Sequence, residues 1–371
     1  MRMLLIMGSS LALTLGLRIV DPPVASAVSP PAAVQPADML VIPAPRAGRT
    51  RPLIAVVADS DGAQTTDFII PYGVLKDSGV ADVRSVSTRP GPIRMTRGLQ
   101  IVADETIAQF DGQAPEGADI VIVPAQARPN SPALLAWLRT QAARGAIIIS
   151  VCEGSRVLAR AGLLDGRRAA SHWGSLDELT HAYPRTNWVR NRRYVQDGPI
   201  ISTAGVTASI PMSLALVEAI GGHDAAAATA RHFGLTNWNA THNTAAFAIE
   251  PADIAAARAA SHAPRERVEI PLEDGVDEVA LALQAEAWGR SIRAEVVTTR
   301  AGRATVRSRH GLSIVPDAEA RPGSLVINAG TLPAVPQLEA TFAEMGRRYG
   351  TGLTRLAILA MEYDPAPQPA N

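Results

Sequence analysis

The chain has one cysteine, and it stands where the sequence predicts a reactive position. An apolar run at residues 146–151 predicts a buried parallel strand, and apolar residues at helical spacing follow from Val157 until Gly162. Cys152 therefore falls on the turn between a strand and a helix N-terminus, where Gly154 permits a tight bend. Because a helix N-terminus carries a partial positive charge, we expect a lowered thiol pKa and a nucleophile at Cys152.

An inert cysteine is the alternative interpretation, because free cysteines often pack in protein cores as small hydrophobic residues. The strand–turn–helix setting favours a reactive or redox-sensing thiol instead. If Cys152 is a nucleophile, the backbone N–H groups of Glu153 and Gly154 are the candidate oxyanion donors, a role that needs no particular side chain.

The composition limits the classes of partner. The 371 residues suffice for two domains, and a hydrophobic content of 47% supports a real core. Lys plus Arg and Asp plus Glu number 35 each, so the formal charge gives no reason to expect nucleic acid or a membrane surface as partner. The seven histidines and one cysteine lack metal-ligand spacing, so neither a metal nor a cofactor is expected.

The first 50 residues predict export. Arg2 precedes an apolar run at residues 4–17, and small residues follow at 25–27, which is the layout of a signal peptide over residues 1–27. Arg18 leaves the run short for a bilayer-spanning helix, so an uncleaved membrane anchor is the alternative to cleavage after Ala27. Residues 28–50 are rich in Pro and Ala and are expected to be a linker. A lone cysteine suits an oxidising periplasm, because it cannot form an intramolecular disulfide.

The elements that must position the cysteine alternate between short buried strands and amphipathic helices. Such alternation predicts an α/β fold with a doubly wound, mostly parallel sheet, whose functional site lies at the carboxyl ends of the strands. Residues 88–97 are expected to form a polar excursion from it. Strands are expected at residues 53–57, 83–86, 98–102, 118–124 and 146–151, helices at 66–76, 131–144, 176–182 and 210–220, and a hairpin with an Asp-Gly turn at 194–203.

Several motifs occur in an order that resembles the ThiJ/PfpI superfamily. They are Val-Cys-Glu-Gly-Ser, Ala-Gly-Leu-Leu-Asp-Gly-Arg, Ser-His-Trp, Tyr-Val-Gln-Asp-Gly and Thr-Ala-Gly-Val-Thr-Ala-Ser-Ile, and the resemblance covers residues 51–247. It implies a class I glutamine amidotransferase-like, flavodoxin-like fold. Within the superfamily, the chain is most similar to the branch that contains isonitrile hydratase and the amidase-like domains of AraC-type regulators.

The resemblance implies roles for three residues, and Glu153 is a fourth candidate from its own chemistry. Cys152 maps to the nucleophile, and Asp67 maps to an acidic position near the thiol. An ionised Asp67 would oppose a thiolate, so it is expected to be a protonated donor or a proton shuttle, with a helix N-terminal charge as the alternative. His172 falls where relatives often place a histidine near the cysteine, although it could instead end a strand. Glu153 is either the acid itself or a solvated side chain on the first helical turn.

Departures from the family pattern leave the reaction open. Glu153 stands where isonitrile hydratase-like proteins carry Thr and protease-like members carry His, and the usual Gly-Gly turn after the fourth strand is replaced at residues 125–127. We expect an exported protein that attacks a small electrophilic carbon, as in hydration or amide hydrolysis. The alternative is a ligand-binding, redox-sensing or regulatory module without a DNA-binding domain.

The second half carries a weak internal repeat. Residues 297–300 are similar to 86–89, residues 311–317 to 98–104, and residues 347–350 to 230–234. The repeat has no cysteine, so residues 265–363 are expected to be a truncated, catalytically silent copy of the same fold, with coincidental α/β patterning as the alternative.

The expected partners are a small-molecule substrate or ligand and, as an open alternative, a second copy of the chain. No basic recognition helix follows residue 264, so nucleic acid is not expected. One basic and aromatic cluster is interpreted as a solvated surface. It contains Arg185, Trp188, Arg190, Arg192, Arg193 and Tyr194.

Overall fold

The computed structural model describes residues 39–330 and 332–364, which belong to the compact unit Met39–Asn371. The predicted signal peptide, and the predicted linker up to residue 38, lie outside the described residues. Residues 39–50 form no helix or strand, but Arg46 and Arg49 bind the Asp119 carboxylate of the unit. In the described part of the chain, no helix is long and apolar enough to cross a membrane. Export therefore stays a prediction.

The central sheet confirms the predicted architecture. Within the described residues it has seven strands in the order β10-β11-β7-β6-β1-β2-β5, and all neighbours run parallel except β10 against β11. The inner strands are apolar on both faces because helices cover both sides. Their bounds are β1 Leu53–Ala58, β2 Asp82–Ser87, β5 Glu105–Thr106, β6 Ile120–Val123, β7 Ile147–Ser150, β10 Tyr194–Asp197 and β11 Ile200–Thr203.

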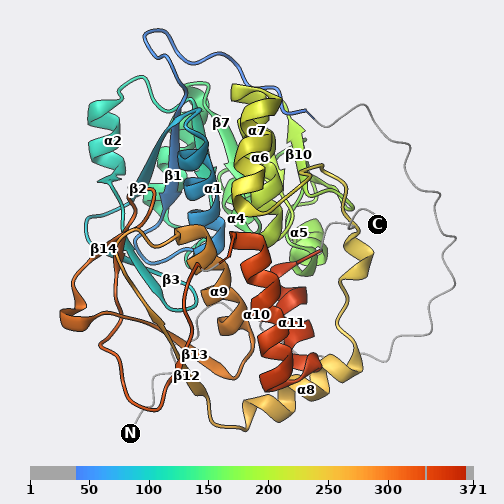
Figure 1. Ribbon diagram of the computed structural model, residues 1–371. Helices are drawn as coiled ribbons and strands as arrows, with labels where there is room; N and C mark the ends of the chain where they lie inside the picture. Colours follow the sequence, from blue (N-terminus) through green and yellow to red (C-terminus); the bar gives the residue numbers. More distant parts are fainter. Residues whose placement is uncertain (1–38, 331, 365–371) are drawn as a thin grey trace, which may run out of the picture. The chain divides into compact units, whose positions relative to one another are not determined.

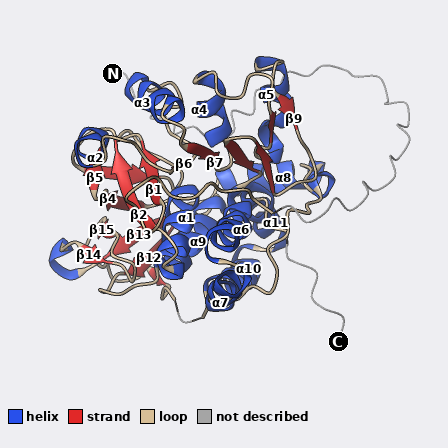
Figure 2. Cartoon of the chain, turned by 90° about the horizontal axis from the view of Figure 1, so that it is seen from above, coloured by secondary structure: helices blue, strands red, loops and turns tan. Residues whose placement is uncertain are grey.

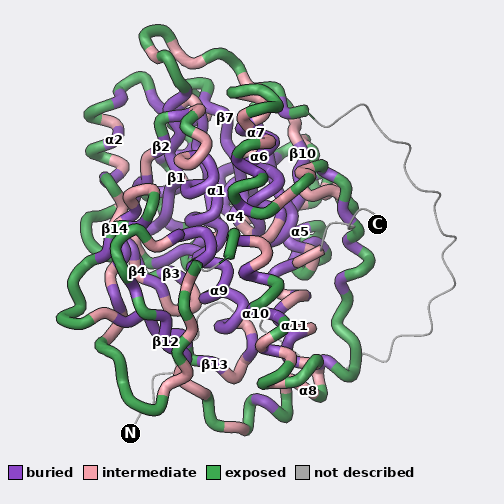
Figure 3. The backbone as a smooth tube through the Cα atoms, viewed as in Figure 1, coloured by how far each residue is buried: buried purple, intermediate pink, exposed green. Residues whose placement is uncertain are grey.

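Helices from both halves of the chain pack together where the halves meet. Helix α1 packs against α6 and α9, and α10 packs against α9 and α11 (Figures 1 and 2). The tube in Figure 3 is buried along α1, α9 and the inner strands. The helices are α1 Thr65–Ser78, α2 Ile107–Gln113, α3 Pro132–Ala143, α4 Gly154–Arg160, α5 Leu176–Ala182, α6 Ser209–Gly221, α7 His223–Phe233, α8 Pro251–Ser261, α9 Glu278–Arg290, α10 Ala334–Tyr349 and α11 Thr351–Met361.

Three smaller sheets complete the described part of the unit. One has the order β13-β12-β16 and is parallel, one has the order β14-β15-β4-β3 and is antiparallel, and β8 pairs with β9. Their strands are β3 Pro92–Met95, β4 Leu99–Val102, β8 Arg168–Ala169, β9 Asn187–Trp188, β12 Glu266–Pro271, β13 Ala294–Thr299, β14 Val306–Arg307, β15 Ser313–Val315 and β16 Leu325–Val326.

The second half repeats the strand arrangement of the first. Strand β12 lies between parallel neighbours β13 and β16, as β1 lies between β2 and β6. In the first half Asp104 accepts hydrogen bonds from the N–H and hydroxyl of Ser85, and in the second half Asp317 accepts the same pair from Thr298. This match agrees with the predicted similarity of residues 311–317 to 98–104.

The helix pairs repeat as well. Helix α6 joins α7 through Gly222 (φ 85°, ψ 169°), and α10 joins α11 through Gly350 (φ 84°, ψ 163°). Both second helices then end at a left-handed residue, Gly234 and Glu362. The second half is thus a partial copy of the fold, and its described residues contain no counterpart of the strand and turn that carry Cys152. The domain boundaries 51–247 and 265–363 stay predictions.

The structure corrects four sequence expectations. The predicted matches of residues 297–300 to 86–89 and of 347–350 to 230–234 are out of register, since Thr298 corresponds to Ser85 and Gly350 to Gly222. The expected polar excursion 88–97 contains β3, which pairs with β4 in a separate antiparallel sheet. This β3–β4 hairpin leaves the central sheet because β4 pairs with β15 of the equivalent hairpin in the second half. The strand expected at residues 98–102 is β4, which lies in that separate sheet and not in the central one.

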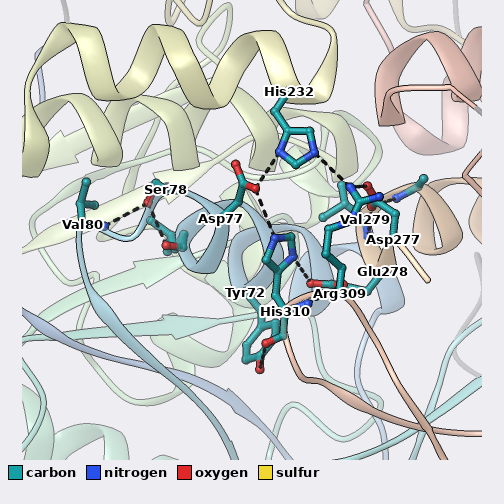
Figure 4. A network of polar contacts seen from close by, with 12 residues as sticks. Tyr72, Asp77, Ser78, Val80, His232, Asp277, Glu278, Val279, Arg309 and His310 are labelled. Carbon is teal, nitrogen blue, oxygen red and sulfur yellow. Dashed lines mark hydrogen bonds and ion pairs between the residues drawn. The ribbon is translucent and has the colours of Figure 1, made fainter. Parts of the chain in front are cut away.

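A polar network joins the two halves beside α1 (Figure 4). His310 contacts Glu278 through Nδ1 (2.6 Å) and Asp77 through Nε2 (3.2 Å). Asp77 also accepts from His232, whose other ring nitrogen lies 3.0 Å from Arg309. Burial alone would lower the pKa of His310, but hydrogen bonds to Asp77 and Glu278 raise it to about 9. The His310 imidazolium is therefore charged at neutral pH and binds one carboxylate from each half, Asp77 and Glu278.

Replacing His310 should test this pair of ionic contacts. An unfolded histidine titrates near about 6.5, so the raised folded-state pKa contributes stability that is fully present below that pH and is lost as the pH rises through about 9. We expect His310→Gln to lower the free energy of unfolding by about 2 kcal/mol at pH 6 and by clearly less at pH 10. Denaturant titration at both pH values measures this, with exposed His262→Gln as control. A loss for His310→Gln that does not change with pH would contradict the assignment.

Candidate active site

Cys152 lies at the carboxyl end of β7, on a sharp turn into α4. Its backbone adopts φ 56°, a left-handed conformation that is uncommon for a residue with a side chain. Gly154 is required two residues later, because a Cβ there would lie 2.0 Å from the carbonyl oxygen of Val123 on β6. The start of α4 therefore lies directly against the neighbouring strand β6. The tight bend that the sequence predicted from Gly154 is present.

Asp67 is fully buried on the first turn of α1. Its Oδ2 accepts a hydrogen bond from the backbone N–H of Ala125 at 3.2 Å, and its Oδ1 has no hydrogen-bond partner in the described part of the chain. Burial raises the pKa of Asp67 well above its usual value, against the Ala125 hydrogen bond. Its carboxyl group is therefore suited to donate a proton at neutral pH.

The thiol does not have the lowered pKa that the helix N-terminus suggested. Burial raises the pKa of Cys152 well above its usual value, and the nearby acids Asp67, Glu153 and Glu362 raise it further. A hydrogen bond from the Glu153 backbone N–H opposes this rise. Helix α4 has seven residues, so its partial charge is outweighed by desolvation and by three acids.

Glu153 is ionised. Burial alone would raise its pKa, but a hydrogen bond from Ser175 and the charge of Arg156 hold the pKa of this carboxyl below its usual range. Arg156 lies 3.1 Å away and also binds Glu178 at 2.6 Å. Asp67 is therefore better placed than Glu153 to be the acid.

The two predicted oxyanion donors differ in availability. The N–H of Gly154 donates to the carbonyl of Val151 at 2.8 Å, so the turn itself uses it. The N–H of Glu153 points to the Cys152 sulfur. The N–H of Ala125, in the segment that replaces the usual Gly-Gly turn, is used by Asp67. Of these groups, Glu153 N–H is the one aimed at the reacting atom.

His172 is buried, and the backbone occupies both of its ring nitrogens. Nδ1 accepts from the N–H of Gly174 at 3.1 Å, so Nε2 carries the proton and faces the carbonyl of Ala360 at 3.3 Å. Burial lowers the pKa of His172, which keeps it neutral. These contacts fit the alternative of a structural position, and a proton relay through His172 stays a prediction.

Three charged residues that the sequence analysis missed reach this site from the second half. Arg290 of α9, with a side chain 19% exposed, acts on both Cys152 and Asp67. Its pKa is raised, against burial, by the buried Glu286, whose Oε1 lies 2.6 Å from Nε. Glu362 follows α11 and fills space that Gly205 leaves open, since a Cβ at Gly205 would lie 2.4 Å from its Oε2.

Glu362 is held in place from both sides. Its Oε1 lies 2.8 Å from His242 Nε2, and its Oε2 accepts from the Trp173 N–H at 3.1 Å. The sequence offered one signal for α9: Glu286 and Arg290 are four residues apart in an otherwise apolar helix, which indicates a buried ion pair. No sequence signal linked that helix to Cys152.

A parallel α/β sheet with a cysteine on a strand–helix turn and a buried acid beside it defines a class of cysteine-containing flavodoxin-like proteins. Residues 53–219 match the DJ-1/PfpI family, to which the chain belongs. Isonitrile hydratase of Pseudomonas putida is 33% identical over 169 residues, which cover 44% of this chain and 70% of that protein. The HTH-type transcriptional regulator CdhR of Pseudomonas aeruginosa is 34% identical over 153 residues, which cover 40% of this chain and only 44% of the regulator.

Two solved structures are similar to part of this chain. A ThiJ/PfpI family protein from Pseudomonas syringae is 27% identical, with a TM-score of 0.44, and the match covers 49% of this chain and 74% of that one. DJ-1beta of Drosophila melanogaster is 23% identical, with a TM-score of 0.45, and the match covers 50% of this chain and all of that one.

The rate of alkylation should report the charges around the thiol. Because the pKa of Cys152 is raised, we expect iodoacetamide to react at pH 7.5 more slowly than with a free cysteine peptide. Glu153→Gln should increase the rate because it removes an ionised carboxylate, and Arg290→Gln should decrease it because it removes the cation. Mass spectrometry across pH 6–10 measures the rates, with Arg290→Lys as the charge-preserving control. Equal rates for Glu153→Gln and Arg290→Gln would contradict this electrostatic account.

Gly154 should tolerate no side chain. We expect Gly154→Ala to lower the free energy of unfolding by about 2 kcal/mol or more, because its Cβ meets a backbone carbonyl that cannot move independently. Gly112→Ala in α2 is the matched control, since nothing lies within 4 Å of its Cβ and alanine favours a helix. Thermal and urea unfolding of both variants compare the two sites. A fully stable Gly154→Ala protein would show that the turn is built differently.

Proposed function

We propose that the chain is a cysteine-dependent enzyme that adds Cys152 to a small electrophilic carbon and then replaces the sulfur by water. The observation that carries this proposal is the pairing of a thiol held on a strained turn with a buried, protonated Asp67. At neutral pH both groups hold their protons, so the thiol needs an acceptor for its proton and the substrate needs a donor.

The proposed first step uses both groups together. The sulfur forms a bond to the substrate carbon as the thiol loses its proton, and Asp67 gives its own proton to the substrate atom that receives the electron pair. The thiol proton then restores the Asp67 carboxyl. Arg290 supplies a positive charge next to the sulfur while it is anionic, and the Glu153 N–H donates to the same region.

In the second step water attacks the same carbon. The sulfur–carbon bond breaks, and the sulfur recovers a proton. With an isonitrile this sequence gives an N-substituted formamide. With an amide, the C–N bond of the first adduct breaks and the amine leaves with a proton before water attacks the thioester, so the products are an amine and a carboxylic acid. The name of the Pseudomonas putida relative, isonitrile hydratase, favours hydration, and the chain covers 70% of that protein.

Turnover of defined substrates tests the proposal. Formamide formation from an aliphatic isonitrile and release of p-nitroaniline from a small anilide would be measured for the wild type and three variants. Cys152→Ala should abolish activity, and Asp67→Asn should lower kcat by about a hundred-fold or more. Asp177→Asn, at an exposed carboxylate paired with Arg190, should leave activity unchanged. Undiminished turnover by Cys152→Ala would rule out the mechanism.

A regulatory module is the second candidate, and the similarity to CdhR favours it. In the described part of the second half, α10 and α11 pack against α9 and α8. For a redox-sensing module we expect no turnover of either substrate but reversible oxidation of Cys152 by peroxide. Mass spectrometry after peroxide treatment separates the candidates, and an unmodified Cys152 would count against the sensor.

A further inference from the structure

A cavity of about 350 Å³ lies between the two halves, away from the thiol. It is formed by the start of α6, the loop after α7, the first turns of α10 and the segment after α11 (Figure 1 labels these helices). Cys152 and Asp67 are not among the residues that line it. Its apolar wall consists of Ile210, Pro211, Leu235, Val335 and Leu338. Ligand sites commonly combine such a volume with a few charged groups.

Arg193 lines this cavity, and this one residue departs from the expectation that the basic and aromatic cluster is a solvated surface. Its side chain is only 11% exposed, whereas that of Arg190 in the same cluster is 49% exposed. Arg193 Nη1 donates to the carbonyl of Asn239 at 3.4 Å, and Nη2 lies 3.7 Å from Asp364, beyond hydrogen-bond distance. The Arg193 guanidinium is therefore mostly buried, and among the described residues its charge is balanced only by one long hydrogen bond and one distant carboxylate.

Two carboxylates line the same cavity. Asp364 is the loosely held partner of Arg193, and Glu339 accepts a hydrogen bond from Tyr363 at 2.8 Å. A simple carboxylate ligand would satisfy Arg193 but would meet both acids, and a simple amine would leave Arg193 unsatisfied. A ligand that carries an ammonium group and a carboxylate on the same carbon atom can pair with an acid and with Arg193 at once.

We propose that this cavity binds a free α-amino acid with an apolar side chain. The ligand carboxylate would bind Arg193 as a bidentate pair, and its ammonium group would bind Asp364 or Glu339. The apolar side chain would lie against Ile210, Leu235 and Leu338. The site is separate from the thiol, so the proposal does not depend on the proposed reaction.

Calorimetric titration with leucine and phenylalanine tests the proposal on the full chain. At least one of these amino acids should bind, and 4-methylpentanoate and 3-methylbutylamine, which each keep only one charge of leucine, should bind at least about ten-fold more weakly. Binding of either single-charge analogue as tightly as leucine would overturn the proposal, and so would the absence of binding by both amino acids.

Variants locate the binding. Arg193→Gln should weaken the binding of the amino acid at least about ten-fold, and Arg190→Gln, at the exposed arginine of the same cluster, should leave it unchanged. Leu235→Trp fills the cavity without removing a charge and should also abolish binding, which keeps the test decisive if Arg193→Gln folds poorly. Cys152→Ala should bind as the wild type does. Wild-type affinity in both Arg193→Gln and Leu235→Trp would place the ligand elsewhere.

Discussion

The packing of α9 against α1 is the contact on which the rest of the structure depends. The helices approach closely because α1 has a glycine at the crossing: a Cβ at Gly73 would lie 2.5 Å from a methyl group of Val279. This approach brings Arg290 to the buried Asp67 and Cys152. A buried cation is costly unless it is paired, and Glu286 on the next turn of α9 supplies the partner. The charge that acts on the thiol thus comes from the half of the chain that contains no cysteine.

The same contact has the form of a two-fold interface built within one chain. Strands β4 and β15 pair antiparallel with Ile101 opposite Ile314, and these two residues hold equivalent places in their hairpins, opposite Ile93 and Val306. Pairing of equivalent residues across an axis is what two identical subunits produce. The second copy keeps the elements at this contact, and the part of it that the structure describes lacks the thiol-bearing turn. It supplies charges instead, most clearly at Glu362, which occupies the position equivalent to Gly234.

The electrostatics of the site follow from burial rather than from the helix N-terminus. The Cys152 thiol and the Asp67 carboxyl both have raised pKa values, whereas Glu153, whose side chain is 41% exposed and bound by Arg156, has a lowered one. Two acids of the same chemistry therefore hold opposite protonation states because their partners differ. This division separates a proton donor from a fixed negative charge beside one thiol.

The sequence by itself determined the first half well. Apolar runs and turn residues placed β1, β6 and β7 and the helices α1, α3 and α6, and the lone Cys152 before Gly154 marked the turn, because these signals are local. Tertiary structure alone decided the thiol pKa, the pairing of β3 and β4 with the copy, and the register of the repeat. It also decided that Arg290 and Glu362 meet Cys152, more than 100 positions away along the chain. Those properties depend on burial and on contacts between distant segments, which residue spacing does not encode.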